Sequence, residues 1–394
     1  MIYLVAGEES GDALGGALAR SLAQRGAKLT GVGGRAMAAA GIVSPFPIEE
    51  LSILGFTAIP RRLPTILRRI GETAAAIIAA RPDALVIIDS PDFTHRVARR
   101  VRRAAPSIPI LDYVSPSVWA WRPWRARAMR RYIDCVLAIL PFEPAAHLRL
   151  GGPPCLYVGH PLTERVAELR PDAEEAGRRE RKPPLILALP GSRTSEIRRL
   201  LAIFGATFAR LAERIGPFEP VLPTMPHLSA MVSAGVADWP IRPRIVLDPA
   251  EKWAAFRSAR AALAASGTVT LELAISGVPT VGAYRVSLIE EAVGRLMRLP
   301  ELTTIILANL VIGENVVPEF VQRDCVPEKL ADALVPLVLD TVERRRQVEA
   351  FNRLDAIMAI GAASPSSQAA AIVLEAAQRG RRGAAAINPA PQPC

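Results

Sequence analysis

The chain has 394 residues, of which 50% are hydrophobic and 22% are charged. This length is enough for two domains, and the apolar fraction excludes an intrinsically disordered chain. No run approaches the ~18 apolar residues that a transmembrane helix needs, and the first residues enter a strand-like pattern without a secretory signal. The net charge of +10 comes almost entirely from arginine. It favours an anionic partner (nucleic acid, acidic lipid or a phosphorylated substrate), with a solvated basic surface as the alternative.

The cysteines and histidines are scattered along the chain. None of Cys135, Cys155, Cys325 and Cys394 belongs to a C-x-x-C pair, and the four histidines show no ligand spacing. The sequence therefore predicts a reducing cytoplasm, with no disulfide framework and no metal site.

The first half alternates short apolar runs with helical patterns. Strands are expected at residues 2–6, 29–32, 85–88, 110–114 and 136–140, with a helix at 13–24. Continuous apolar strands separated by helices are typical of a parallel sheet covered on both faces. We therefore predict a doubly wound α/β domain over residues 1–165.

A polar stretch then predicts a linker over residues 166–184. Further strands are expected at 185–189, 220–222, 245–247, 261–265 and 280–283, which predicts a second doubly wound domain over residues 185–341. Residues 342–378 are expected to form one or two long helices. Residues 379–394, rich in glycine, alanine, proline and arginine, are expected to be a disordered tail.

Acidic and hydroxyl side chains follow two strands of the first half. Glu8 and Ser10 lie in the glycine-containing loop after residues 2–6, and Asp89 and Asp92 follow residues 85–88. A carboxylate at the end of a buried strand is typical of a general base, so Asp89, Asp92 and Glu8 are catalytic candidates. The alternatives are a tight turn with Ser10 or Asp12 as N-cap in the first loop, and Asp89 as the cap of the helix that follows it.

An aromatic segment follows the strand at 110–114. Rings and hydroxyls together suit a sugar or an acyl chain, and ordinary packing is the alternative. The candidates for acceptor or lipid contact in this segment are Ser115, Ser117, Trp119, Trp121 and Arg122.

Two strand-to-helix junctions of the second half predict a nucleotide diphosphate site. Exposed N–H groups and an arginine would hold the diphosphate, and Glu272 would bind a ribose diol. A capping box explains either junction alone. The candidates are Gly191, Ser192, Arg193 and Glu196 at the first junction and Ser266, Gly267, Thr268 and Glu272 at the second.

A basic amphipathic stretch precedes the second candidate loop of the first half. Leu63, Ile66, Leu67 and Ile70 fall on one helical face, beside Arg61, Arg62, Arg68 and Arg69. This pattern predicts contact with lipid, and a core-facing helix is the alternative.

Taken together, five segments resemble, in order, the lipid-A-disaccharide synthase family of bacterial inverting glycosyltransferases with the GT-B fold. They are LVAGEESGD, SPSVWAWR, LPGSR-x-x-E, ASGT-x-x-LE and ANL…VPEF-x-Q. The resemblance implies two Rossmann-like domains facing a cleft, with the last helices returning to the first domain. It also implies that Asp89 is the base and Arg193 the nucleotide-site arginine, and that Asn309 and Gln322 lie near the nucleotide.

The resemblance implies transfer of a sugar from UDP-2,3-diacylglucosamine to 2,3-diacylglucosamine 1-phosphate (lipid X), giving the lipid A disaccharide 1-phosphate and UDP. It further implies no cofactor, a peripheral location on the cytoplasmic face of the inner membrane, and a homodimer that exchanges carboxyl-terminal parts. The alternatives are another UDP-sugar enzyme of the same fold, such as an epimerase or a peptidoglycan glycosyltransferase, or a basic protein that binds nucleic acid. We expect no nucleic-acid partner.

Overall fold

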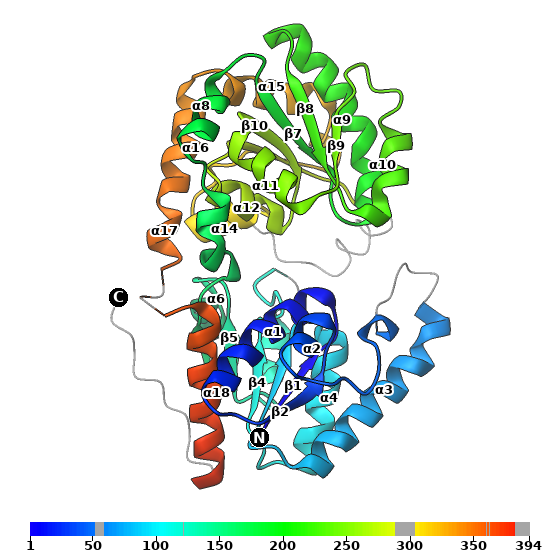
Figure 1. Ribbon diagram of the computed structural model, residues 1–394, viewed down its shortest axis with the longest axis vertical. Coiled ribbons are helices and arrows are strands. Elements are labelled where there is room, and N and C mark those ends of the chain that lie inside the picture. The colour runs from blue at the N-terminus through cyan, green and yellow to red at the C-terminus, as the bar shows by residue number, and fades with distance from the viewer. Residues whose placement is uncertain (52–58, 121, 288–303, 360, 362, 383–394) are drawn as a thin grey trace. The chain divides into compact units, whose positions relative to one another are not determined.

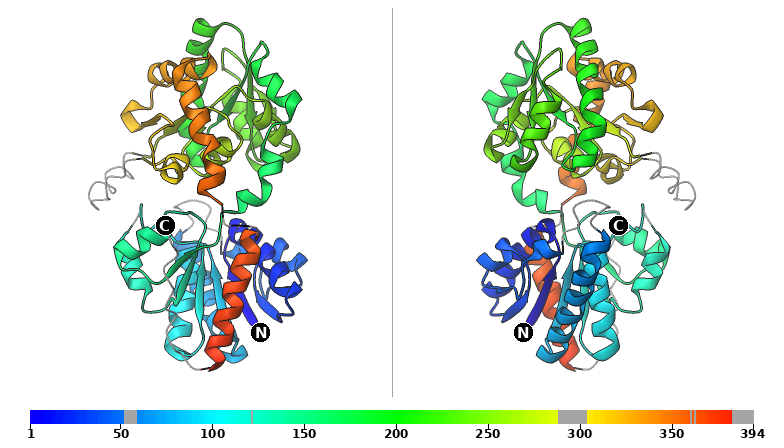
Figure 2. Two further views of the ribbon diagram at one scale, coloured as in Figure 1. Left: turned by 90° about the vertical axis from the view of Figure 1, so that its left-hand side faces the viewer. Right: turned by 90° about the vertical axis from the view of Figure 1, so that its right-hand side faces the viewer.

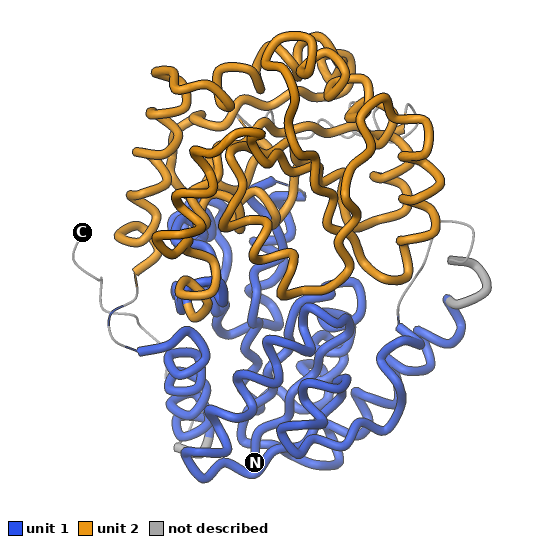
Figure 3. Tube along the Cα trace, turned by 45° about the horizontal axis from the view of Figure 1, so that its top comes forward, with its two compact units in different colours: residues 1–163, 360–394 blue, residues 164–359 orange. Residues whose placement is uncertain are grey.

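The computed structural model describes the chain except residues 52–58, 121, 288–303, 360, 362 and 383–394. The chain forms two compact units (Figure 3). Unit 1 contains Met1–Thr163 together with the residues from Ile360 onward, and unit 2 contains Glu164–Ala359. The chain therefore leaves unit 1, completes unit 2, and then returns to unit 1.

Unit 1 is built on a six-stranded parallel sheet with the strand order β2-β1-β3-β4-β5-β6. The strands are β1 Ile2–Ala6, β2 Leu29–Val32, β3 Ala84–Ile88, β4 Ile110–Tyr113, β5 Cys135–Ala138 and β6 Cys155–Tyr157. Its helices are α1 Glu9–Gln24, α2 Arg35–Ala39, η1 Ile48–Glu50, α3 Ile59–Ala80, α4 Pro91–Ala104, α5 Trp124–Met129, α6 Glu143–Leu150 and α18 Pro365–Arg382; η3 Pro161–Arg165 crosses the boundary to unit 2.

Alternate residues of the strands point to opposite faces of this sheet, and helices cover both faces (Figures 1 and 2). Tyr3 and Val5 belong to one core cluster, which α3 and α4 complete. Ile2 and Leu4 belong to the other, which α1 and α18 complete. The helix α18 packs against α1 and β3, so the end of the chain supplies part of the core of unit 1.

Unit 2 repeats this design with the strand order β12-β11-β10-β7-β8-β9. The strands are β7 Leu185–Leu189, β8 Glu219–Pro223, β9 Arg244–Val246, β10 Ala261–Ala265, β11 Thr280–Tyr284 and β12 Glu319–Val321. Its helices are α7 Val166–Leu169, α8 Ala173–Glu180, α9 Thr194–Ile215, η4 Pro226–Leu228, α10 Ser229–Gly235, α11 Pro249–Ser258, α12 Thr268–Ile275, α14 Leu307–Ile312, η5 Gln322–Asp324, α15 Pro327–Val338, α16 Val342–Asn352 and α17 Leu354–Ile357.

The predicted fold class of two doubly wound α/β units is confirmed. The structure gives other bounds to several segments. Most of residues 166–184 is helical, since α7 and α8 lie there, and the Asp172 side chain caps α8 by accepting from the Glu175 N–H. Only α18 of the last helices packs in unit 1, because α16 and α17 pack against α15, α12 and α14 in unit 2. Helix α18 also continues through residues 379–382, and the rest of the predicted tail lies outside the described residues.

None of the helices in the described parts of the chain is both long enough and apolar enough to cross a membrane.

Candidate active site

In unit 1, the order in which strands are added to the sheet changes direction between β1 and β3. From β1 the chain proceeds to β2 on one side, and β3 returns to the other side of β1. Ligands of doubly wound folds bind at the carboxyl ends of the strands at such a switch point. The loop that carries Glu8 and Ser10 follows β1, and Asp89 follows β3, so both lie at this edge of the sheet.

Asp89 is held by a network of short hydrogen bonds. The Ser10 Oγ donates to Asp89 Oδ2 at 2.7 Å, and the Ser90 N–H donates to Asp89 Oδ1 at 2.8 Å. The Ser90 Oγ donates to Glu8 Oε1 at 3.0 Å, which brings the second carboxylate to the same place. The structure thus brings together Glu8, Ser10 and Asp89 from two loops.

The backbone at Asp89 and Ser90 is strained. Both residues have left-handed φ angles, 54° and 48°, which non-glycine residues rarely adopt in succession. Gly11 allows this turn to approach α1, since a Cβ there would lie 2.9 Å from the Ile88 carbonyl oxygen and 3.4 Å from the Asp89 Cβ. Strain of this kind is concentrated at functional sites, because the surrounding structure must stabilise it.

Asp92 lies outside this network. It is in the first turn of α4, its side chain is 86% exposed, and it accepts from Arg125 Nη2 at 3.3 Å. As a catalytic candidate it has none of the contacts that hold Asp89.

The aromatic segment after β4 begins with another strained residue, Val114, whose φ is 82°. Ser115 is buried, and its Oγ lies 2.8 Å from Nε2 of the fully buried His147. Burial lowers the pKa of His147 to about 4, so the ring is neutral near pH 7. Ser115 therefore anchors the segment from inside, and the expectation that it contacts the acceptor is wrong for this structure.

Trp119 anchors the same segment at a second point. Its Nε1 donates to Glu143 Oε1 at 3.3 Å, and its ring meets Phe142 edge-on at 5.2 Å. Burial raises the pKa of Glu143 to about 7. Ser117 is exposed and Arg122 is half-buried, whereas Trp121 lies outside the described residues.

A buried pair behind this edge escaped the sequence analysis. His95 Nε2 lies 3.0 Å from Asp112 Oδ2, and His95 Nδ1 lies 3.1 Å from the Tyr132 hydroxyl. Burial raises the pKa of the Asp112 carboxyl, which is 1% exposed within β4. The sequence feature that could have revealed this pair was Asp112, the one acidic residue of strand β4.

The corresponding switch point of unit 2 lies between β7 and β10. After β7, Gly191 has a φ of 116°, and a Cβ there would lie 2.5 Å from Glu196 Oε2. That oxygen accepts from the Ser192 N–H at 3.2 Å and the Arg193 N–H at 3.3 Å, while Arg193 Nη1 donates to Glu196 Oε1 at 2.7 Å. The N–H groups predicted to bind a diphosphate thus already bind a carboxylate of the same loop.

The loop after β10 lies at the same edge, because β10 pairs directly with β7. The Ser266 Oγ donates to the Ile305 carbonyl at 2.7 Å, while Gly267 and Thr268 are exposed at the start of α12. Glu272 accepts from Lys252 Nζ at 3.0 Å. Lys252 belongs to α11 and to none of the motifs, which is why sequence reasoning missed it.

Asn309 and Gln322 bind backbone groups of their own unit. Asn309 is 1% exposed and its amide is fully engaged, with Nδ2 donating to the Val317 carbonyl at 2.9 Å and Oδ1 accepting from the Val317 N–H at 2.9 Å. Gln322 Oε1 accepts from the Val286 N–H at 2.7 Å. Asn309 therefore shapes the loop before β12, and its place near the nucleotide stays a prediction.

The amphipathic stretch in α3 is divided between core and surface. Ile66 and Ile70 are buried, and with Ala74 and Ile77 they belong to a core cluster of unit 1. The prediction that Ile66 and Ile70 contact lipid is therefore wrong, because they already pack inside the protein. Leu63 and Leu67 remain 42% and 40% exposed. The side chains of Arg61 and Arg62 lie outside the described residues.

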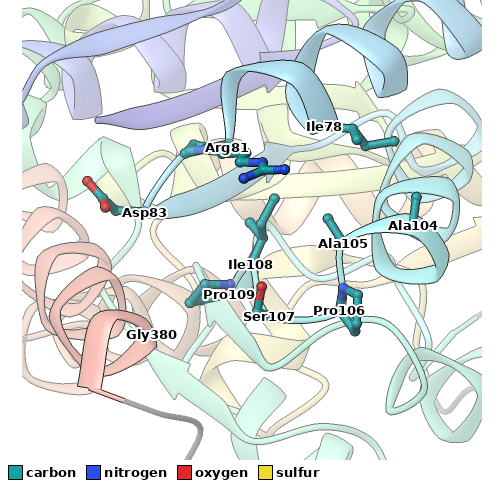
Figure 4. A pocket seen from close by; sticks show the side chains of 11 residues that line it. Ile78, Arg81, Asp83, Ala104, Ala105, Pro106, Ser107, Ile108, Pro109 and Gly380 are labelled. Atoms are coloured by element: carbon teal, nitrogen blue, oxygen red, sulfur yellow. The ribbon is translucent and has the colours of Figure 1, made fainter.

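A pocket of about 430 Å³ lies at the other edge of the unit 1 sheet (Figure 4). Its lining includes Arg81 and Asp83 before β3, Ser107 and Pro109 before β4, and Gly380 of α18. These residues precede the strands, so the pocket is separate from the strand ends that carry Asp89. No group of three side chains able to bind a metal is found in the described part of either unit.

Comparison with known proteins gives the family. The model of the family described as lipid-A-disaccharide synthetase matches residues 2–373. A lipid-A-disaccharide synthase of Bradyrhizobium diazoefficiens is 60% identical over 384 residues, which cover 97% of each chain. Two solved structures share the fold at low identity. The UDP-GlcNAc 2-epimerase of Neisseria meningitidis has a TM-score of 0.61 at 12% identity, covering 96% of this chain and 99% of its own. The calicheamicin glycosyltransferase CalG4 has a TM-score of 0.56 at 18% identity, covering 96% and 98%.

Proposed function

The chain belongs to the lipid-A-disaccharide synthase family, and from this premise we propose that it joins UDP-2,3-diacylglucosamine to 2,3-diacylglucosamine 1-phosphate. The products are the β(1→6)-linked lipid A disaccharide 1-phosphate and UDP. The enzyme is thus an inverting glycosyltransferase of lipid A biosynthesis. The fold alone is shared with epimerases at 12% identity, so the near-complete 60% match carries the choice among reactions.

The proposed base is Asp89. It removes the proton from the 6-hydroxyl of the acceptor while that oxygen forms a bond to C1 of the donor sugar. The bond from C1 to the diphosphate oxygen breaks on the opposite side, and UDP departs with the electron pair. The observation that carries this role is the Asp89 carboxylate, fixed by Ser10 and Ser90 at the strand ends of unit 1.

Glu8 and Asp92 are the other candidates for the base. Glu8 is linked to Asp89 through Ser90, whose hydroxyl donates to Glu8 and whose N–H donates to Asp89, so Glu8 adds negative charge beside the base. Asp92 pairs with Arg125 and is largely exposed. These contacts favour Asp89 over both.

The diphosphate is proposed to bind at the switch point of unit 2. Arg193 and the N–H groups of Ser192 and Arg193 would balance the charge that grows on the departing UDP, as oxyanion-binding groups do. The diphosphate would replace the Glu196 carboxylate on these donors. Gly267 and Thr268 would offer the start of α12, and Glu272 the ribose contact beside Lys252.

Peripheral membrane attachment and dimerisation complete the proposal. Both substrates are acylated, and the exposed Leu63 and Leu67 of α3 offer apolar contacts to acyl chains. Ser117, Trp119, Trp121 and Arg122 remain candidates for acceptor contact.

A homodimer that exchanges carboxyl-terminal parts would place α18 of one chain against α1 of the other. Light scattering with size-exclusion chromatography tests whether the dimer forms.

The direct test is incubation of the purified protein with both substrates in detergent, followed by mass spectrometry of the lipid product. A disaccharide 1-phosphate together with stoichiometric UDP is expected. Release of UDP without a disaccharide, or isomerisation of the donor sugar, would contradict the proposed reaction.

A further inference from the structure

Two neighbouring helices of unit 1 expose large apolar side chains. Helix α5 packs against α6. Their inner sides bury Ala126 and Met129 from α5 and His147 from α6. On the outside, Trp124 is 55% exposed and Leu148 is 84% exposed. The sequence analysis assigned no role to either residue.

Uncompensated positive charge surrounds these two side chains. Arg127, Arg130, Arg131 and Arg149 are exposed, and none of them has an ion-pair partner within the described ranges of the chain. The sequence from 122 to 131 contains no acidic residue. Asp92 pairs with Arg125, Asp134 pairs with Arg102, and Glu143 of α6 is buried, so these carboxylates do not balance the four arginines.

The basic residues of α3 differ in this respect. Arg69 contacts Glu50 at 2.8 Å and Glu72 at 2.7 Å, and Arg68 lies 3.8 Å from Glu72. Their charge is balanced within the protein. The described arginines of α3 therefore attract an external anion less strongly than the four arginines of α5, α6 and the turn after α5.

We propose that Trp124, Arg127, Arg130, Arg131, Leu148 and Arg149 form an anionic-lipid-binding surface. This α5–α6 surface rests on the proposed function, since acylated substrates reach the enzyme from a membrane. Arginines gain from the negative potential of an anionic leaflet, and tryptophan prefers the interface between headgroups and acyl chains. Leu148 is aliphatic and almost fully exposed, so a phosphate backbone of nucleic acid would leave it without a partner, whereas a bilayer buries it.

The surface can be tested by flotation of the full chain with vesicles. One set contains phosphatidylglycerol in phosphatidylcholine, and the other contains phosphatidylcholine alone. We expect binding to the first set, little binding to the second, and loss of binding at high salt, which screens the attraction.

Two variants separate charge from apolar contact. Arg127→Gln/Arg130→Gln/Arg131→Gln is expected to weaken vesicle binding about 100-fold, since each basic residue near the surface contributes about fivefold. Trp124→Ser/Leu148→Ser is expected to weaken binding at least about tenfold. Turnover of detergent-dispersed substrates should be retained in both variants. A failure of the lipid-binding proposal can therefore be told apart from a failure of the proposed reaction.

Unit 2 offers matched controls. Arg181→Gln/Arg242→Gln/Arg346→Gln removes the same charge from exposed positions, and Leu339→Ser/Val342→Ser removes exposed apolar side chains. Binding should persist in both controls. If the control variants lost as much vesicle binding as the test variants, the location of the substituted residues would not matter, and the proposal would be overturned. It would also be overturned if only Leu63→Ser/Leu67→Ser abolished flotation, or if the test variants lost binding to RNA but not to vesicles.

Discussion

Asp89 and Asp92 are three residues apart but lie in different surroundings. Ser10 and the Ser90 N–H fix the first carboxylate, whereas the second is exposed beside Arg125. This contrast provides a matched pair of substitutions. Asp89→Asn keeps the size of the side chain but removes the proton acceptor, so turnover should fall by roughly 10²–10⁴ while UDP binding persists.

Turnover of both variants can be followed by mass spectrometry of the disaccharide product, with UDP affinity measured by calorimetry. Asp92→Asn should remain within a few-fold of the parent, because only a partly exposed ion pair is lost. Near-normal turnover of Asp89→Asn would remove Asp89 from the role of base and direct attention to Glu8.

Arg193 is the residue on which the proposed diphosphate site depends most. Arg193→Ala should weaken UDP binding by about 10- to 100-fold, the usual effect of losing a hydrogen bond to a charged group. Arg198→Ala is the control, since Arg198 is exposed one turn further along α9. Equal UDP affinity in the two variants, measured by titration calorimetry, would place the diphosphate elsewhere.

The same site predicts turnover that needs no divalent metal. In the proposed site, protein N–H groups and Arg193 would supply the positive potential for the leaving diphosphate, in place of their bonds to Glu196. A chelator should therefore leave the rate unchanged. Loss of activity with EDTA that magnesium restores would show that this account is wrong.

At the scale of elements, the buried strands could be predicted from sequence almost to the residue. Strands β1, β7 and β10 have the expected bounds because each is a continuous run whose five residues are all buried. The edge strands β6 and β12 escaped prediction, since they have three residues each and are only partly buried. Their pairing depends on neighbours that local sequence does not reveal.

From the sequence, a residue of the candidate site could be predicted only where its position along the chain, at the end of a strand, already places it at the site. Strand ends indicated Asp89, Arg193 and Glu272 because parallel strands place their carboxyl ends at one edge. Side-chain partners depend on packing between distant segments, so Lys252 as the partner of Glu272 was not foreseen. The Glu196 carboxylate on the Arg193 N–H is local, and it is the capping box that the sequence offered as the alternative at this junction. For the same reason, helical periodicity alone did not distinguish Ile70 in the core from Leu67 on the surface.

Buried titratable groups in and after α6 make the stability of unit 1 depend on pH. Burial lowers the pKa of His147 and His160 to about 4 from 6.5, so the unfolded chain binds more protons between those values. Stability should therefore fall as the pH drops from 6.5 towards 4. Burial raises the pKa of Glu143 from 4.5 to about 7, so the folded chain binds the extra proton there and this group favours folding as the pH falls. At about 1.4 kcal/mol per pKa unit the two histidines outweigh Glu143 alone by roughly 3 kcal/mol. The Asp112 carboxyl, whose pKa burial also raises, acts in the same sense as Glu143.

Urea denaturation across this pH range checks the balance. His147→Gln should flatten the pH dependence of the unfolding free energy, because it removes one of the two histidines that destabilise the folded state as the pH falls. His227→Gln is the control, since His227 is exposed in unit 2 and its replacement should leave the slope unchanged. A slope that His147→Gln does not alter would contradict the assignment.

At the scale of the whole molecule, α18 contributes to the core of unit 1 from the far end of the chain. Val373 is fully buried with Ala369 and Ala370 against the sheet, and Arg25 donates to Ser367 at 2.7 Å. Val373→Ala should destabilise unit 1 by about 1–3 kcal/mol, the effect of removing buried methyl groups. Gln378→Ala, at an exposed position of α18, should have little effect in the same thermal melts. Equal melting temperatures would show that α18 contributes little.

The return of the chain to unit 1 has a consequence for synthesis on the ribosome. Unit 2 is a single uninterrupted segment and can fold as soon as it emerges, whereas one face of the unit 1 sheet lacks part of its cover until α18 joins α1 there. At about 5–20 residues per second, the interval between the ends of the two unit 1 segments is roughly 10–40 s. During this time Leu4, Val86 and Leu111 line a strand surface without its last helix. The nascent chain is therefore most open to aggregation, or to capture by a chaperone, before α18 has been made.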